Sequence, residues 1–125
     1  EAIRDLTNGG VDFAIDLAGV IAAMDTAYQI IRYGGSVVTA GLSPINTKFS
    51  FNHSDLVAQE KSILGSYMGS CVPVRDVPRF LNLYLQGRLP VDKLIDGKIG
   101  FDNLNEGFDK LSKGEVVRQI LLPNG

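Results

Sequence analysis

Three short segments of the 125-residue chain place glycine or other small residues where an apolar run ends. Glycine lets the main chain approach a flat ligand closely, and the N–H and C=O groups of such a segment can bind a carboxamide. In open parallel sheets, ligands bind beyond the carboxyl ends of the strands, where these segments would lie. The alternative is that the glycines only turn the chain, and spacing alone leaves both interpretations open. The segments are Leu17-Ala18-Gly19, Ala40-Gly41-Leu42 and Ser66-Tyr67-Met68.

Two charged residues occupy positions from which they could contact a ligand. Asp16 follows an apolar run and could bind a ribose, but an aspartate there more often caps the following turn, and we favour the turn. Arg118 lies between apolar residues of the last predicted strand. Its planar guanidinium would fit a phosphate, and an outward-facing arginine on an edge strand is the equally simple alternative.

The residue types needed for catalysis or metal binding are scarce. His53 is the only histidine and Cys71 the only cysteine, whereas a zinc site needs three or four ligands. The sequence contains no nucleophile–base pair and no carboxylate dyad that could act as general acid and base. The G-x-G-x-x-G loop that binds a dinucleotide pyrophosphate is also absent from these residues. We therefore predict no catalytic residue and no metal ligand set in this chain.

Residues 11–42 contain the elements that would position the candidate segments. Apolar runs at residues 11–16 and 36–41 predict two strands. Between them, apolar residues at three- and four-residue spacing predict a helix over residues 20–32, which Gly34-Gly35 would end. Because both runs are apolar throughout, we expect helices on both faces of a parallel sheet.

The remaining sequence continues the alternation of helices and strands. A further strand is predicted at residues 62–68, an extended segment at 94–101 and a final strand at 116–122. Residues 1–8 read as the end of a helix that feeds the first strand directly, so we expect the rear part of a longer protein. The fold class is α/β, with further helices predicted at 54–60, 76–87 and 103–114.

Composition limits the classes of partner and location. Apolar residues make up 45% and charged residues 21%, which is typical of a globular domain rather than a disordered chain. A net charge of −2 gives no reason to expect nucleic acid or an anionic membrane as a partner. No apolar run is long enough to span a bilayer. A single cysteine cannot form an internal disulfide, and we expect a cytoplasmic protein.

Four stretches, taken in order, resemble the C-terminal third of a medium-chain, zinc-type alcohol dehydrogenase of the zinc-binding dehydrogenase superfamily. They are GGVDFAIDLAG, IIRYGGSVVTAGL, SILGSYMGS and LNEGFDKLSKGEVVRQILLP. In that family a catalytic domain carries zinc and a Rossmann domain, a doubly wound parallel sheet, binds NAD(H). The resemblance implies that residues 1–68 are the second half of the Rossmann domain. It also implies that residues 69–125 are an α/β tail that returns to the catalytic domain.

The same resemblance implies a nicotinamide cofactor, NAD or NADP, and a small alcohol or aldehyde substrate for the parent enzyme. Ala18-Gly19 matches the loop beside the adenosine and ribose, and Ala40-Gly41-Leu42 the segment that holds the nicotinamide ring and its amide. Ser66 and Met68 match the next loop, whose backbone meets the carboxamide, and Arg118 matches a basic residue near the pyrophosphate. The family's zinc ligands, proton-relay residues and NAD-selecting acidic residue have no counterpart here. Zinc is therefore expected only in the parent, and this chain alone should be inactive.

Two other functions share part of the pattern. A class I methyltransferase also has a strand ending in an acidic residue, a helix, a Gly-Gly turn and an apolar strand, but it usually finishes with an antiparallel hairpin strand. A non-catalytic α/β interaction module is the third possibility, because fold alone does not determine function.

We also expect self-association. In the Rossmann order, the apolar strand at 63–67 lies at a sheet edge without charges or proline to discourage pairing, so it should join two chains in at least a homodimer.

Overall fold

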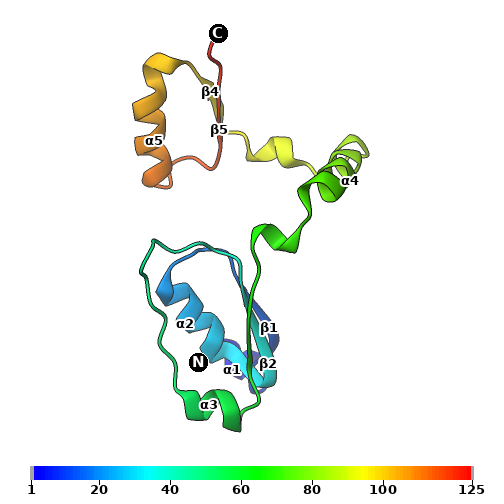
Figure 1. Cartoon of the computed structure of the whole chain (residues 1–125), viewed down its shortest axis with the longest axis vertical. Helices are drawn as coiled ribbons and strands as arrows, with labels where there is room; N and C mark the ends of the chain where they lie inside the picture. Colours follow the sequence, from blue (N-terminus) through cyan, green and yellow to red (C-terminus); the bar gives the residue numbers. More distant parts are fainter. Residues whose placement is uncertain (1, 125) are drawn as a thin grey trace. The chain divides into compact units, whose positions relative to one another are not determined.

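The computed structural model describes residues 2–124 of the chain. Its contacts divide the chain into two compact units, the first ending at Cys71 and the second beginning at Val72. Figure 1 labels most of the helices and strands of each unit.

The first unit is built on a three-stranded parallel sheet with the order β1-β2-β3. The strands are β1 (Val11–Asp16), β2 (Ile31–Thr39) and β3 (Ser62–Gly65). Asp16 is paired with Thr39, and Thr39 with Gly65, so the carboxyl ends of all three strands are level. The prediction of an α/β fold with a parallel sheet is confirmed.

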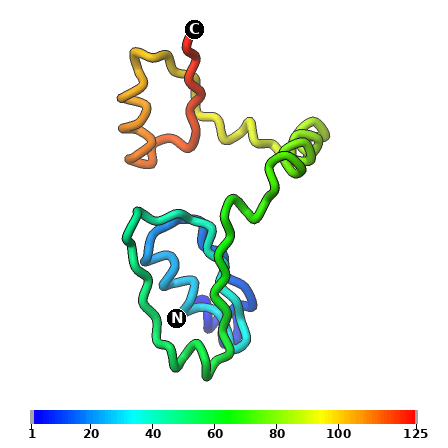
Figure 2. Tube along the Cα trace, in the orientation of Figure 1, coloured from blue at the N-terminus to red at the C-terminus, as the bar shows by residue number. Residues whose placement is uncertain are grey.

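The helices of this unit are α1 (Ala2–Leu6), α2 (Ile21–Ile30) and α3 (His53–Ala58), and Glu1 of the predicted first helix lies outside the described residues. Ile31 and Val37 of β2 are fully buried at the centre of the core. Around them pack β1, α2 and α3 through Ala14, Met24, Ala27, Tyr28 and Leu56. The loop between β2 and α3 runs back along the unit and brings α3 to the end where β3 begins (Figure 2).

The predicted end of α2 is wrong, because the helix stops at Ile30 and β2 starts at the next residue. Gly34 and Gly35 lie inside β2 rather than after a helix, at a bulge where the register against β1 shifts between Val11 and Phe13. Gly34 has a φ of +70°, and a Cβ on Gly35 would lie 2.8 Å from the Arg32 carbonyl oxygen. The glycine pair therefore bends a strand at this position.

One face of the sheet is exposed, so the prediction of helices on both faces is wrong for the described chain. Ala14 of β1 is buried under α2, whereas its neighbours Phe13 and Ile15 are 70% and 67% exposed. On β3, Leu64 is 52% exposed. An uninterrupted apolar run indicates a strand here, but the number of covered faces depends on which other elements are present.

The second unit contains α4 (Pro73–Leu85), β4 (Gly97–Ile99), α5 (Leu104–Ser112) and β5 (Gln119–Leu121), and β4 and β5 pair in parallel. Helix α4 begins three residues before Asp76, the predicted cap, although the Asp76 carboxylate does accept the Val72 N–H at 2.8 Å. Short 3-10 turns lie at Met68–Ser70, Val91–Leu94 and Phe101–Asn103. Within residues 2–124, each helix is too short or too polar to cross a membrane.

Candidate functional site

The segments after β2 and β3 meet at the carboxyl edge of the first sheet. Together with Thr39 they line a shallow depression of about 380 Å³, to which the loop after β2 contributes Ala40, Gly41 and Leu42 and the end of β3 contributes Gly65, Ser66 and Tyr67. The structure therefore brings four of the predicted site residues, Ala40, Gly41, Leu42 and Ser66, to one place. The two segments are joined where the Ser66 N–H donates to the carbonyl oxygen of Thr39, the residue before Ala40, at 2.9 Å.

In the loop after β1, Gly19 packs against Leu42 and Gly41 of this group, while Ala18 binds Asp16 through its N–H. A Cβ on Gly19 would lie 2.6 Å from the Leu42 carbonyl oxygen, and the Gly19 φ of +67° favours glycine for a second reason. The Ser43 hydroxyl donates to the Gly19 carbonyl oxygen at 2.8 Å. Gly19 is thus required for the close packing of the loops after β1 and β2, and its carbonyl oxygen already accepts a hydrogen bond from Ser43.

Asp16 holds the turn after β1, as predicted. Its Oδ1 accepts the Ala18 N–H at 3.0 Å, and its Oδ2 accepts the Thr39 hydroxyl at 2.9 Å. The residue is only 5% exposed.

Tyr67 and Met68 differ in their relation to the depression. Met68, a predicted site residue, is exposed and begins a 3-10 turn with a φ of +50°, while Tyr67 lines the depression. The candidate segment Ser66-Tyr67-Met68 included Tyr67 without giving it a role, and sequence reasoning did not single out Thr39 or Gly65. The register of the parallel strands could have indicated these residues. Residues that are register partners at the carboxyl ends of neighbouring strands, such as Thr39 and Gly65, border the same ligand-binding edge.

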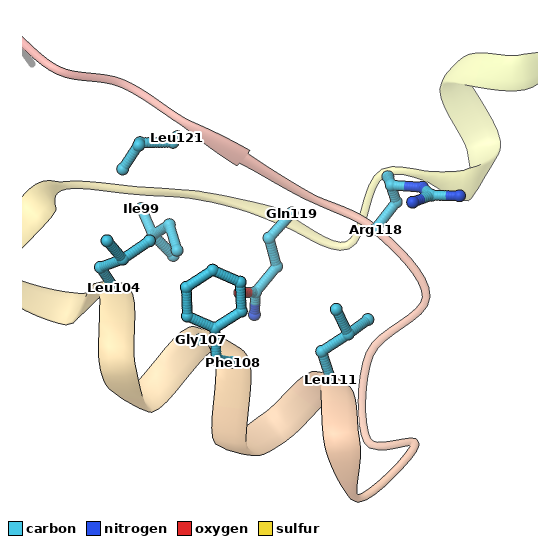
Figure 3. A pocket seen from close by; sticks show the side chains of 8 residues that line it. All are labelled: Ile99, Leu104, Gly107, Phe108, Leu111, Arg118, Gln119 and Leu121. Carbon is cyan, nitrogen blue, oxygen red and sulfur yellow. The ribbon is translucent and has the colours of Figure 1, made fainter. Parts of the chain in front are cut away.

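Arg118 belongs to the second unit, immediately before β5 rather than inside a strand as predicted. It is exposed and borders a cavity of about 260 Å³ between α5 and the β4–β5 pair. Figure 3 shows Gln119 reaching toward Phe108 of α5, with the Arg118 side chain directed away from that helix. The remaining lining is apolar and comprises Ile99, Leu104, Gly107, Leu111 and Leu121.

Asp96 holds the main chain at Arg118. Its Oδ2 accepts the N–H groups of Val117 and Arg118, the latter at 3.0 Å, and the Asp96 N–H donates to the Arg118 carbonyl oxygen at 2.8 Å. The N–H groups of Arg118 and Val117 lower the pKa of the Asp96 carboxyl, since they stabilise its charged form. Asp96 therefore binds both the N–H and the carbonyl oxygen of Arg118.

The donor set of this chain does not fit a zinc ion. Across residues 2–124, no three His, Cys, Asp or Glu side chains come together in a group that could hold a metal. His53 is exposed at the start of α3, and Cys71 is a free, half-buried thiol.

A sequence model of the family described as "Zinc-binding dehydrogenase" matches residues 1–86. The chain belongs to the zinc-binding dehydrogenase family. Alcohol dehydrogenase 1 of Cenchrus americanus is 33% identical over 122 residues, which cover 97% of this chain and 32% of that protein. Benzyl alcohol dehydrogenase from Acinetobacter calcoaceticus is similar in structure, with a TM-score of 0.84 and 30% identity over 96% of this chain and 33% of its own.

A third similar protein is a candidate zinc-binding dehydrogenase from Sinorhizobium meliloti 1021, solved bound to NADP. It has a TM-score of 0.74 and 25% identity, covering 98% of this chain and 36% of its own. This zinc-binding dehydrogenase chain therefore spans about a third of the length of the relatives it matches. The strand pairs within residues 2–124 are all parallel, which together with the family match argues against the methyltransferase interpretation.

Proposed function

We propose that this chain supplies part of the nicotinamide-binding domain of an alcohol dehydrogenase, which transfers a hydride between a small alcohol or aldehyde and NAD or NADP. The observation that carries the proposal is the depression at the carboxyl edge of the parallel sheet, formed by Thr39–Leu42 and Gly65–Tyr67. Ligands of open α/β sheets bind at this edge. The NADP-bound relative adds support for a nicotinamide cofactor, and the names of the other relatives for an alcohol.

The shape and lining of the depression suit one end of such a cofactor. A nicotinamide is a flat ring with a carboxamide, and it needs close main-chain approach together with N–H and C=O groups. Ala40-Gly41-Leu42 would hold the ring and amide, and the backbone at Ser66 and Met68 would bond the carboxamide. A Cβ on Gly65 would meet no atom within 4 Å, which indicates open space beside β3.

The other assignments follow from the family. Ala18-Gly19 would lie beside the adenosine ribose and Arg118 near the pyrophosphate. Residues 1–68 would belong to the Rossmann domain and residues 69–125 to a tail that returns to the catalytic domain. The division of the chain between Cys71 and Val72 supports a boundary close to this one.

The chemistry assigned to this chain is binding and orientation. When bound, the cofactor would accept or donate the hydride, and the residues of the depression would keep its ring in one orientation. Proton transfer and any zinc belong to other parts of the parent enzyme, because these residues offer no suitable donor set. The cytoplasmic location remains a prediction.

The proposal is tested by titrating the ¹⁵N-labelled chain with NADH and, in parallel, with S-adenosylmethionine. We expect NADH to shift the amide signals of Ala40–Leu42 and Gly65–Tyr67 with a dissociation constant on the order of millimolar, since the phosphate-binding loop is not part of these residues. S-adenosylmethionine should cause no saturable shifts. Shifts with S-adenosylmethionine alone, or with neither compound, would refute the proposal, and micromolar NADH binding would show that the main anchor lies elsewhere.

We also propose that the chain forms at least a homodimer through β3. Within the described residues β3 pairs only with β2, so its outer edge is free, and the exposed Leu64 side chain adds apolar surface. Sedimentation equilibrium at micromolar concentration should give a dimer or larger species. Leu64→Lys or Ile63→Pro should reduce the mass to that of a monomer. Ile45→Lys, at a loop residue that is 93% exposed, is the control and should leave association unchanged.

A further inference from the structure

The end of β1 is tied to the end of β2, which lines the depression, by one buried carboxylate and one hydroxyl. Asp16 closes β1 and Thr39 closes β2, and the two residues are register partners in the sheet. The Asp16 side chain accepts the Ala18 N–H and the Thr39 hydroxyl, with distances of 3.0 and 2.9 Å. One carboxylate oxygen therefore binds the loop after β1, and the other binds the last residue of β2.

The main chain of the same two residues extends these links. The Asp16 carbonyl oxygen accepts the Ala40 N–H at 2.8 Å and the Gly41 N–H at 3.3 Å, and the Thr39 carbonyl oxygen accepts the Ser66 N–H at 2.9 Å. A continuous chain of hydrogen bonds thus runs from Ala18 through Asp16 and Thr39 to Ser66. It passes through all three segments proposed to contact the cofactor.

Burial makes these bonds strong determinants of the local geometry. Asp16 is 5% exposed, so its carboxylate cannot exchange its protein partners for water, and an unsatisfied buried carboxylate would be costly. The same burial leaves the side chain inaccessible to a ribose. Asp16 must therefore contribute to cofactor binding indirectly, through the Ala18 N–H and the Thr39 hydroxyl that its carboxylate binds.

We propose that Asp16, acting with the Thr39 hydroxyl, is a positioning residue for the nicotinamide-binding main chain, an inference that rests on the proposed function. Without the carboxylate, the Ala18 N–H and the hydroxyl of Thr39, the residue that immediately precedes the loop at Ala40, lose their common acceptor. Main-chain groups that bind a flat amide must be placed accurately. In enzymes, a misplacement of about 1 Å can lower the reaction rate on the order of 100-fold.

The test compares Asp16→Ala with Asp16→Asn in the 125-residue chain. Asp16→Ala removes both side-chain bonds, whereas Asp16→Asn keeps an oxygen for the Ala18 N–H and offers an N–H to the Thr39 hydroxyl oxygen. Thr39→Val and Thr39→Ser form the matching pair on β2. Asp12→Ala and Thr26→Val are controls, because Asp12 forms an exposed ion pair with Arg32 and the Thr26 hydroxyl binds the Ala22 carbonyl oxygen on α2.

Two measurements are made on each variant: amide hydrogen exchange at Ala18, Ala40 and Gly41 without ligand, and the NADH titration followed by amide shifts. Asp16→Ala and Thr39→Val should speed exchange at these amides, and Asp16→Ala should weaken NADH binding by about tenfold or more. Asp16→Asn, Thr39→Ser and both controls should stay close to wild type.

The outcomes separate the two proposals. If the wild-type chain binds NADH and Asp16→Ala binds it equally well with unchanged exchange, the positioning role is refuted while the proposed function stands. Binding lost equally in Asp16→Asn and Asp16→Ala would also refute it, because charge and not position would then matter. If the wild-type chain shows no NADH response, the proposed function fails, and the positioning role fails with it.

Discussion

Gly41 and Gly19 pass so close together that a Cβ atom on Gly41 would lie 2.1 Å from the amide nitrogen of Gly19. The obstructing atoms belong to the backbone, so they cannot move away as the end of a flexible side chain could. A side chain of any size at residue 41 must therefore push apart the loops that follow β1 and β2.

The first prediction is that Gly41→Ala destabilises the first unit by at least about 3 kcal/mol, the upper part of the range for overpacked sites. It should also abolish the NADH-induced shifts. Gly65→Ala is the control for stability, because a Cβ there meets no atom within 4 Å. That variant should change the free energy of unfolding by less than about 1 kcal/mol. Urea unfolding measures both, and equal effects of the two substitutions would contradict the packing argument.

The second prediction concerns the core beneath the sheet. Ile31 is fully buried at the point where α2 passes directly into β2. Ile31→Ala should lower the free energy of unfolding by about 2–5 kcal/mol, since it removes buried methyl groups and leaves a cavity. Ile45→Ala, at an exposed loop residue, should change it by less than about 0.5 kcal/mol. A small effect at Ile31 in urea unfolding would mean that this core is not formed in solution.

The third prediction concerns a hydroxyl buried in the same core. The Tyr28 hydroxyl oxygen is buried and has no hydrogen-bond partner among residues 2–124, while its ring packs against Phe49 and Phe51 with centroids 6.1 and 6.0 Å away. Tyr28→Phe keeps the ring and removes the unsatisfied group. The free energy of unfolding should stay the same or rise by about 1 kcal/mol. A loss of more than that amount in thermal or urea unfolding would show that the hydroxyl has a partner in solution.

The fourth prediction is a pH dependence centred on the start of α4. The Arg75 guanidinium and the Val72 N–H, helped by Arg79, lower the pKa of Asp76 to about 2. The folded-state pKa lies below the ordinary value of 3.8, so the stabilisation is complete above that value and is lost as the pH falls through about 2. The Asp76 carboxyl ¹³C shift should accordingly titrate near pH 2.

Asp76→Asn provides the comparison, since it keeps an oxygen for the Val72 N–H but cannot ionise. The stability difference between wild type and variant should be constant near neutral pH and should shrink between about pH 4 and pH 2. Urea unfolding over this range measures it. Parallel pH profiles for the two proteins would contradict the assignment.

Residues 11–42 show how far sequence patterns reach. The apolar runs that contain Ala14 and Val37, and the helical spacing of Met24 and Tyr28 between them, correctly predicted two parallel strands joined by a helix. These signals are local, because each depends on which side of an element a residue faces. The end of the helix was misjudged because Gly34-Gly35 has the same sequence signature whether it ends a helix or bends a strand.

The candidate site, too, was predicted only in part from the sequence. Small residues at strand ends indicated Ala40, Gly41 and Ser66, in segments that also included Tyr67, while Thr39 and Gly65 were found only from the structure. The chain sequence by itself determined the α/β class and the parallel connection. Tertiary structure alone decided that Asp16 bonds Thr39, that Gly19 and Gly41 touch, and that one sheet face is exposed. The physical reason is that these contacts join residues more than 20 positions apart, and no local pattern records which backbones will meet.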